Sequence, residues 1–440
     1  MRMTRKGFLA AAAASLAVSL EAEDAAAVRR REKYPTWPPP VDDPNDPTVD
    51  SEPVLVAPTE SSVGVVWAVG TWCAGGVELS LDPGMGDSWY VPCGGPGRVQ
   101  CDDRVLACRL RRLKPATRYY YRTVTIRFAF AGNYLHQNPQ TVRGRVHSFV
   151  THGGTDEPTF AVLNDTHESW EAIAKSLERT RGDDLLFWNG DMINGPEWRE
   201  LVVRAVLRPG APVPADYASD RPLNFVMGNH ERYGTWSTNH LHEVLMPYPA
   251  ACRAPAFEEL ERNHAFRQGS VAFLLLETGA DKRDDDPRLG VGEAFSPYRR
   301  MQAEWLEAQF RRPEIASAPF VVALCHIPLV DRHCAKDNDL DWCEEASKLW
   351  GPILTKHGVQ LVIAGHTHSW RYDAPTAERP WAELVGGGPG KGREGTAGIP
   401  TAIRGRIEGG RLKVTVTDGG RGAQVAEFVF APRKARQMQG

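Results

Sequence analysis

Short apolar runs alternate with amphipathic segments along the second half of the chain. Runs of four to six buried-type residues predict strands, while apolar residues spaced three or four apart predict helices. The predicted strands are Thr159–Leu163, Leu185–Trp188, Leu223–Met227, Phe320–Cys325 and Leu361–Ala364. The predicted helices are Glu168–Arg181, Trp198–Leu207, Gln302–Phe310 and Lys348–Lys356. This alternation indicates an α/β region with parallel strands, joined by a hairpin at Phe266–Glu277 and followed after Trp381 by antiparallel segments.

An earlier region contains only short alternating segments separated by Gly and Pro turns. The predicted strands are Ser62–Val69, Val77–Leu81, Val105–Leu113, Arg118–Phe128 and Arg145–Val150. Such a pattern is typical of an antiparallel β-sandwich. The segment from Leu113 to Tyr119 (LKPATRY) resembles the tyrosine-corner turn of fibronectin type III-like domains.

The N-terminus has the pattern of an export signal. Arg2, Arg5 and Lys6 precede an apolar, Ala-rich run from Gly7 to Leu20, and small residues suitable for cleavage follow. The segment around Arg5 resembles a twin-arginine signal in which Lys replaces the second Arg, so both the twin-arginine and the general secretory route stay open. We therefore predict an exported, periplasmic or extracellular protein.

Four regions follow from these patterns. They are an export signal peptide at 1–27, a Pro-rich linker at 28–51, a fibronectin-like β-sandwich at 52–151 and a catalytic α/β domain at 157–432.

Composition narrows the possible partners. The 440 residues are 42% hydrophobic and 24% charged, which is ordinary for a soluble globular protein. A net charge of −3 gives no electrostatic reason to expect a nucleic acid partner. No apolar stretch reaches the roughly 18 residues that would predict a membrane span. The oligomeric state does not follow from the sequence.

The eight cysteines contain no C-x-x-C pair, so a structural zinc knuckle is not expected. Cys73, Cys93, Cys101 and Cys108 could form two disulfides in an oxidising compartment, although the connectivity is open. Cys325 lies in a predicted strand and is expected to be a buried thiol.

Residues that commonly bind metals follow each of the five predicted parallel strands. They are Asp165 and His167, then Asp191, then Asn229 and His230, then His326, and finally His366 and His368. Taken singly, each has an ordinary alternative as a turn, a cap or a buried histidine. Because parallel strands bring their carboxyl ends to one edge, we expect a single sheet edge to gather all of them.

The order of these motifs closely resembles the calcineurin-like metallophosphoesterase family. The motifs are D-x-H, G-D, G-N-H-E, an apolar strand ending in His, and G-H-x-H. With the preceding fibronectin-like region, the chain looks like the purple acid phosphatase branch. The resemblance implies a four-layer α/β/β/α sandwich and two metal ions lying close together.

The resemblance also implies the ligands of each ion. The first ion would be bound by Asp165, His167, Asp191 and His368, and the second by Asp191, Asn229, His326 and His366. Asp191 would then be a bridging carboxylate. The ions would be divalent or trivalent, with Fe, Mn and Zn as candidates.

Two cations lower the pKa of a shared water, so a metal-bridging hydroxide could attack phosphorus near neutral pH. By resemblance, His230 would protonate the leaving group, with Glu231 as a candidate for orienting it; a role for His230 as a metal ligand beside Asn229 stays open. We predict an exported phosphoric ester hydrolase, specifically a phosphomonoesterase acting on a small-molecule phosphate ester. A phosphodiesterase or nucleotidase is the alternative on the same core, and a non-catalytic cell-surface adhesion module is the alternative of a different class.

Two departures from the purple acid phosphatases affect the metals. Their first motif usually lacks a histidine, whereas His167 is present here. Their G-D-x-x-Y tyrosine is replaced by Asn194. Without a tyrosinate ligand we expect a colourless protein that does not require a ferric ion.

Overall fold

A computed structural model describes residues 46–95, 97–131, 134–232, 237–249, 257, 259–287, 294–330, 341–389 and 398–433. The predicted signal peptide at 1–27 and most of the predicted linker at 28–51 lie outside these residues. None of the described helices is both long enough and apolar enough to cross a membrane.

The first sheet of the α/β region is mixed. Its strand order is β23-β22-β21-β12-β13-β14-β1-β2-β8. Strands β12, β13 and β14 run parallel, and β21 is antiparallel to β12. The bounds are β12 (Thr159–Leu163), β13 (Leu185–Asn189), β14 (Leu223–Val226), β21 (Thr401–Glu408), β22 (Arg411–Asp418) and β23 (Gln424–Phe430).

The second sheet has the strand order β15-β16-β17-β18-β20-β19. Strands β16, β17, β18 and β20 are parallel, with β15 and β19 antiparallel at the two edges. The bounds are β15 (His264–Gln268), β16 (Val271–Leu276), β17 (Phe320–Cys325), β18 (Leu361–Ala364), β19 (Arg371–Asp373) and β20 (Ala382–Val385).

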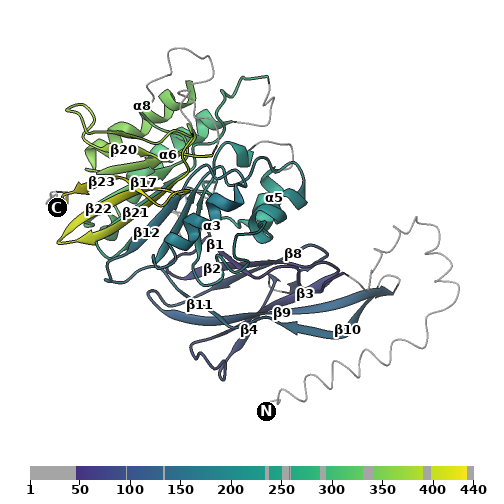
Figure 1. The fold of residues 1–440 in the computed structure, drawn as a ribbon. Coiled ribbons are helices and arrows are strands. Elements are labelled where there is room, and N and C mark those ends of the chain that lie inside the picture. Colours follow the sequence, from purple (N-terminus) through teal and green to yellow (C-terminus); the bar gives the residue numbers. More distant parts are fainter. Residues whose placement is uncertain are drawn as a thin grey trace.

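These two sheets pack face to face, with helices on both outer sides (Figure 1). Because side chains alternate along a strand, Phe160 and Val162 of β12 join the core between the sheets, whereas Ala161 and Leu163 join the core under the outer helices. The outer helices on the first sheet are α3 (Trp170–Arg179), α4 (Arg199–Val202), η1 (Val203–Leu207) and α5 (Ser237–Val244). On the second sheet they are α6 (Phe295–Gln309) and α8 (Asp341–Lys356), with the short α7 (Pro313–Ala316) between them in the chain. The predicted α/β/β/α order is confirmed.

The N-terminal region is rich in β-structure, as predicted. Its main strands are β1 (Val54–Val56), β2 (Ser62–Ala68), β3 (Cys73–Ser80), β8 (Val105–Arg111), β9 (Arg118–Ala131), β10 (Tyr134–Arg143) and β11 (His147–Val150). The short strands are β4 (Trp89–Pro92), β5 (Gly94–Gly95), β6 (Arg98–Val99) and β7 (Cys101–Asp102). The Lys114 amide donates to the Tyr119 hydroxyl at 2.9 Å, which is the hydrogen bond that defines a tyrosine corner.

This N-terminal region is continuous with the first α/β sheet. Strand β1 pairs in parallel with β14 through Val56 and Leu223, and antiparallel with β2. One face of these strands packs under the outer helices, and the other packs on β3 and β9. The β-rich region and the α/β region therefore share a sheet.

The cysteine expectations have mixed outcomes. Cys325 is a buried thiol, as predicted. Cys73, Cys93, Cys101 and Cys108 are not joined to one another by disulfides in the described structure, so the two suggested disulfides are not formed there.

Candidate metal centre

The eight candidate residues come together at the carboxyl ends of five strands. Three strands of the first sheet, β12, β13 and β14, lead into Asp165 with His167, Asp191, and Asn229 with His230. Two strands of the second sheet, β17 and β18, lead into His326, and into His366 with His368. The expectation that a single sheet edge gathers all eight residues is wrong, because two packed sheets each supply part of the candidate centre.

The backbone at these strand ends is strained. Asp165, His167, Asp191, His366 and His368 all have positive φ, between 43° and 69°. Non-glycine residues rarely adopt this left-handed conformation, and each instance costs free energy. A fold holds several such residues together only where the surrounding structure requires it, so the strain makes these strand ends a candidate functional site.

The first group of ligand atoms consists of Asp165, His167, Asp191 and His368. Four ligand atoms, one from each, lie within 4.8 Å of one another. The Nε2 atoms of His167 and His368 are 2.9 Å apart, and His167 Nε2 is 3.5 Å from Asp191 Oδ2. His368 Nε2 is 3.7 Å from Asp165 Oδ1. Two imidazole nitrogens and two carboxylates around one point suit a borderline cation such as Zn²⁺, Fe or Mn.

The second group consists of Asp191, His326 and His366, whose ligand atoms also lie within 4.8 Å of one another. Asp191 Oδ2 is 3.2 Å from His326 Nε2. Asn229 joins this group, since its Oδ1 atom is 2.7 Å from His366 Nδ1. Asp191 is common to both groups, as a bridging carboxylate would be.

Glycines make this close approach possible. A Cβ atom at Gly190, where φ is +83°, would lie 2.2 Å from His326 Nδ1. A Cβ atom at Gly228 would lie 2.2 Å from Asp191 Oδ1, and one at Gly365 would lie 2.3 Å from Asp165 Oδ2. The glycines of the G-D, G-N-H-E and G-H-x-H motifs therefore leave room for ligands that arrive from neighbouring strands.

Protonation within the centre fits cation binding. Burial raises the pKa of Asp165 to about 8. Burial opposes ionisation of Asp191 as well, but the charges of His326 and His230 outweigh it and lower the pKa of Asp191. His326 is also buried, yet Asp191 and Asp165 raise its pKa to about 10. A cation bound by Asp165 and His326 would displace their protons, so its binding would depend on pH.

His167 and His368 favour the neutral, ligand form. Burial lowers the pKa of His167 to about 4, and burial also lowers the pKa of His368. Neutral imidazole is the form that binds metals. The residues of both groups therefore fit a pair of metal ions.

His230 lies beside these groups at the surface. Its Nε2 atom is 4.0 Å from Asp191 Oδ2, and its side chain is 31% exposed. Its Nδ1 atom is 2.7 Å from the carbonyl oxygen of Asn194. His230 therefore faces both the candidate centre and solvent.

The sequence suggests Glu231 as a candidate for orienting His230. The structure shows a different role for its carboxylate. The wholly buried carboxylate instead accepts hydrogen bonds from the amides of Asp191, Met192, Ile193 and Gly228, at 2.7–3.3 Å. It therefore joins the turn after β13 to the turn after β14.

Asn189 also supports the candidate centre, and it was not identified from the sequence. Its carbonyl oxygen is 2.8 Å from His326 Nδ1, which leaves His326 Nε2 turned toward Asp191. Its side-chain amide donates to the carbonyl oxygens of Cys325 and Ile363, at 3.0 and 3.2 Å, on the second sheet. The one signal in the sequence is a polar residue at the last position of an apolar strand.

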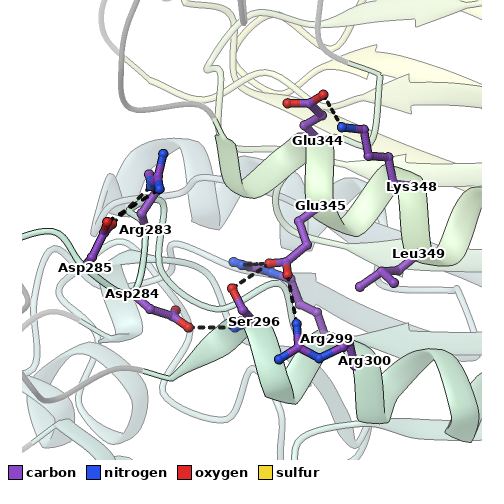
Figure 2. A pocket seen from close by; sticks show the side chains of 10 residues that line it. All are labelled: Arg283, Asp284, Asp285, Ser296, Arg299, Arg300, Glu344, Glu345, Lys348 and Leu349. Atoms are coloured by element: carbon purple, nitrogen blue, oxygen red, sulfur yellow. Dashed lines mark hydrogen bonds and ion pairs between the residues drawn. The ribbon is translucent and has the colours of Figure 1, made fainter.

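A cavity of about 520 Å³ lies apart from these ligands, between α6 and α8. Figure 2 shows that the charged groups lining it face one another. Glu345, for example, accepts hydrogen bonds from Ser296 and Arg299, each at 3.0 Å. None of the eight candidate residues lines this cavity, so it does not define the candidate metal centre.

The arrangement of two packed sheets is shared with solved structures of other proteins. Among solved structures, PhoD is similar over 88% of this chain and 92% of its own, with a TM-score of 0.59 and 14% sequence identity. The purple acid phosphatase PPD1 from yellow lupin (Lupinus luteus) seeds is similar over 86% of this chain and 74% of its own, with a TM-score of 0.57 and 14% identity. At these identities the likeness supports the fold.

Sequence comparisons are more specific. Residues 158–370 match the family model described as calcineurin-like phosphoesterase. Purple acid phosphatase 21 of Arabidopsis thaliana is 24% identical over 270 residues, covering 60% of this chain and 52% of the relative. Purple acid phosphatase 22 of the same plant is 23% identical over 263 residues, covering 59% and 51%. The chain thus spans about half the length of these curated relatives.

The chain therefore carries a calcineurin-like phosphoesterase domain, as the motif order predicted. Domains of this family are metal-dependent phosphoesterases, and the family implies a dinuclear metal centre.

Proposed function

We propose that this protein is a two-metal phosphoric ester hydrolase, specifically a phosphomonoesterase. One observation carries the proposal: two ligand groups share Asp191, and a partly exposed imidazole, His230, faces the shared carboxylate. The first ion would be held by Asp165, His167, Asp191 and His368. The second would be held by Asp191, Asn229, His326 and His366. When bound, such a pair of ions supplies a nucleophilic hydroxide at neutral pH and neutralises phosphoryl oxygens.

The protein's own residues contribute orientation and a proton. Asp191 belongs to both ligand groups, so its carboxylate would offset part of the charge of each cation. The imidazole of His230 keeps its Nδ1 proton on the Asn194 carbonyl, so in the imidazolium form its Nε2 atom can donate a proton to the departing alkoxide. The exposure of His230 gives a substrate access to this proton.

We also propose that the protein is exported. The basic N-terminus followed by the Ala-rich run supports this, since this pattern is read by secretory machinery. Mass spectrometry of the mature protein from the periplasm or medium tests it, because cleavage within residues 22–27 is expected.

The experiment that tests the enzymatic proposal is a substrate panel on metal-depleted protein. Mono- and diesters of phosphate, including nucleotides, are offered after reconstitution with Mn, Zn or Fe across a range of pH. We expect monoester hydrolysis that depends on added metal. Faster hydrolysis of diesters or of nucleotides would replace the monoesterase assignment, and metal binding without any hydrolysis would favour a non-catalytic module.

A further inference from the structure

Asn194 contacts both histidines to which the proposed function gives different tasks. It is the third residue after Asp191 and is exposed at the edge of the candidate centre. Its Oδ1 atom is 3.2 Å from Nδ1 of His167, and its carbonyl oxygen is 2.7 Å from Nδ1 of His230. One residue therefore meets a proposed metal ligand and the proposed proton donor on the same ring atom of each.

The orientation of the Asn194 amide follows from its second contact. Its Nδ2 atom donates to the carbonyl oxygen of His167 at 3.4 Å, which places Oδ1 rather than Nδ2 against the His167 ring. An amide oxygen and a backbone carbonyl oxygen can only accept. Both imidazoles must therefore carry their proton on Nδ1.

This protonation pattern turns both Nε2 atoms toward the centre. With Nδ1 protonated, neutral His167 has its lone pair on Nε2, which is 3.5 Å from Asp191 Oδ2 and 2.9 Å from His368 Nε2. In His230 the same tautomer leaves Nε2 as the ring atom that faces Asp191 Oδ2, at 4.0 Å.

Two residues further from the candidate centre, Glu168 and Arg204, hold Asn194 in place. Its backbone amide donates to Glu168 Oε1 at 3.3 Å, and Glu168 Oε2 is 2.9 Å from Arg204 Nη2. Glu168 is mostly buried, with 12% of its side chain exposed. Glu168 thus holds the backbone of Asn194, and the ion pair with Arg204 of η1 holds Glu168 in turn. The side chain of Asn194 itself is exposed.

We propose that Asn194 is a positioning residue that fixes the Nδ1–H tautomer of both His167 and His230. Through its side chain it prepares His167 to bind a metal by Nε2, and through its carbonyl it keeps the proton-donating nitrogen of His230 facing the substrate. The part concerning His230 rests on the proposed function, whereas the part concerning His167 requires only metal binding.

Nitrogen-15 NMR of the imidazoles in wild-type protein tests both tautomers directly. In the zinc-loaded full chain we expect shifts of a protonated Nδ1 for His167 and for His230, with His167 Nε2 in the metal-bound range. A protonated Nε2 and bare Nδ1 on either neutral ring would overturn the assignment for that residue.

Zinc titration of metal-depleted variants tests the side-chain role without substrate. Asn194→Ala removes Oδ1 but keeps the backbone carbonyl, so we expect the Kd for zinc at the first group to rise about 10- to 100-fold. Asn194→Asp retains an acceptor for His167 and should bind zinc within a few-fold of wild type. Glu197→Ala, at an exposed position three residues further along the chain, is the matched control, and thermal unfolding verifies that each variant is folded.

Unchanged zinc affinity in Asn194→Ala would overturn the positioning role, as would an equal loss in Asn194→Asp. If the NMR and zinc results are as expected but the panel shows no ester hydrolysis, the positioning role stands while the proposed function fails. The two failures are therefore distinguishable.

Discussion

His230 is held by Nδ1 and presents Nε2 to the proposed metal centre. If it protonates the leaving group, His230→Ala should keep both metals but lower kcat about 10²- to 10⁴-fold for alkyl phosphates, the range of a lost general acid. The loss should be much smaller for p-nitrophenyl phosphate, whose leaving group needs little protonation. Steady-state kinetics on both esters measures this.

The control for that variant is His242→Ala. His242 Nε2 is 2.6 Å from Glu261 Oε1, so this histidine is engaged elsewhere and its removal should affect both esters little. An equal loss for the two esters in His230→Ala would contradict proton donation and would favour the ligand role that the sequence left open.

At the residue scale, the sequence was informative wherever a ligand follows an apolar strand. Asp165 and Asp191, for example, each lie two residues beyond the end of a buried strand, and the structure brings both into the candidate centre. Glu231, Asn189 and Asn194 could not be assigned in this way. They act largely through hydrogen bonds with backbone amides and carbonyls, which motif spacing does not reveal; the one sequence signal is the polar Asn189 at the end of an apolar strand.

At the scale of elements, Glu231 joins the turns after β13 and β14 through four backbone amides. Glu231→Gln leaves one oxygen and directs an NH₂ group at amides that can only donate. Each buried amide left without an acceptor costs about 1–3 kcal/mol, so we expect a loss of several kcal/mol in the free energy of unfolding. Denaturant titration measures it.

Glu171→Gln is the matched control, because the Glu171 side chain is 80% exposed on α3. A Glu231→Gln variant as stable as this control would contradict the structural role of the Glu231 carboxylate.

The connection between β11 and β12 carries a buried histidine that makes stability depend on pH. His152 stacks on Phe266 of β15 with ring centroids 3.9 Å apart, and burial lowers its pKa from 6.5 to about 3. Between these values the unfolded chain binds a proton that the folded protein does not. Stability from this group is therefore complete above pH 6.5 and is lost as the pH falls, by about 2 kcal/mol at pH 5.

His152→Phe tests this dependence, because it preserves the stacking and removes the titrating group. We expect the loss of unfolding free energy between pH 7 and pH 5 to be about 2 kcal/mol smaller in the variant. Parallel curves for wild type and variant would show that His152 does not carry this dependence.

Strands could be predicted from the sequence where their runs of apolar residues were long and uninterrupted. Strands β12 and β17 have the predicted bounds, whereas β20, which extends the parallel second sheet, was missed. Strand β20 has four residues and includes Glu383, a polar residue that argues against a buried strand. The structure shows the reason: Glu383 is buried and accepts hydrogen bonds from the amides of Leu329 and Val330, at 2.7 and 3.0 Å.

At the scale of the whole molecule, the N-terminal strands and the α/β region are one structural unit. Besides the pairing of β1 with β14, the hydroxyl of Tyr121 donates to the carbonyl of Ser219 at 2.8 Å, and Arg104 forms an ion pair with Glu200 at 2.6 Å. The sequence suggested two separate regions, because strand pairing between distant segments cannot be read from local patterns.

Since both regions share a sheet and a core, we expect them to unfold together. Calorimetry of the metal-depleted full chain should show one transition, with equal calorimetric and van't Hoff enthalpies. Two resolved transitions would contradict the shared core. Saturating zinc should raise the transition temperature, because ligands that bind only the folded state stabilise it.

The central claim is that Asp191 belongs to both ligand groups, so that one carboxylate organises two ions. Elemental analysis of purified wild-type protein and the Asp191→Ala variant, after reconstitution and removal of free metal, tests this most directly. Asp103→Ala, which removes a carboxylate 51% exposed beside Arg199, is the matched control. We expect two equivalents in the wild type and the control and close to none in Asp191→Ala, whereas two full equivalents in Asp191→Ala would contradict the account.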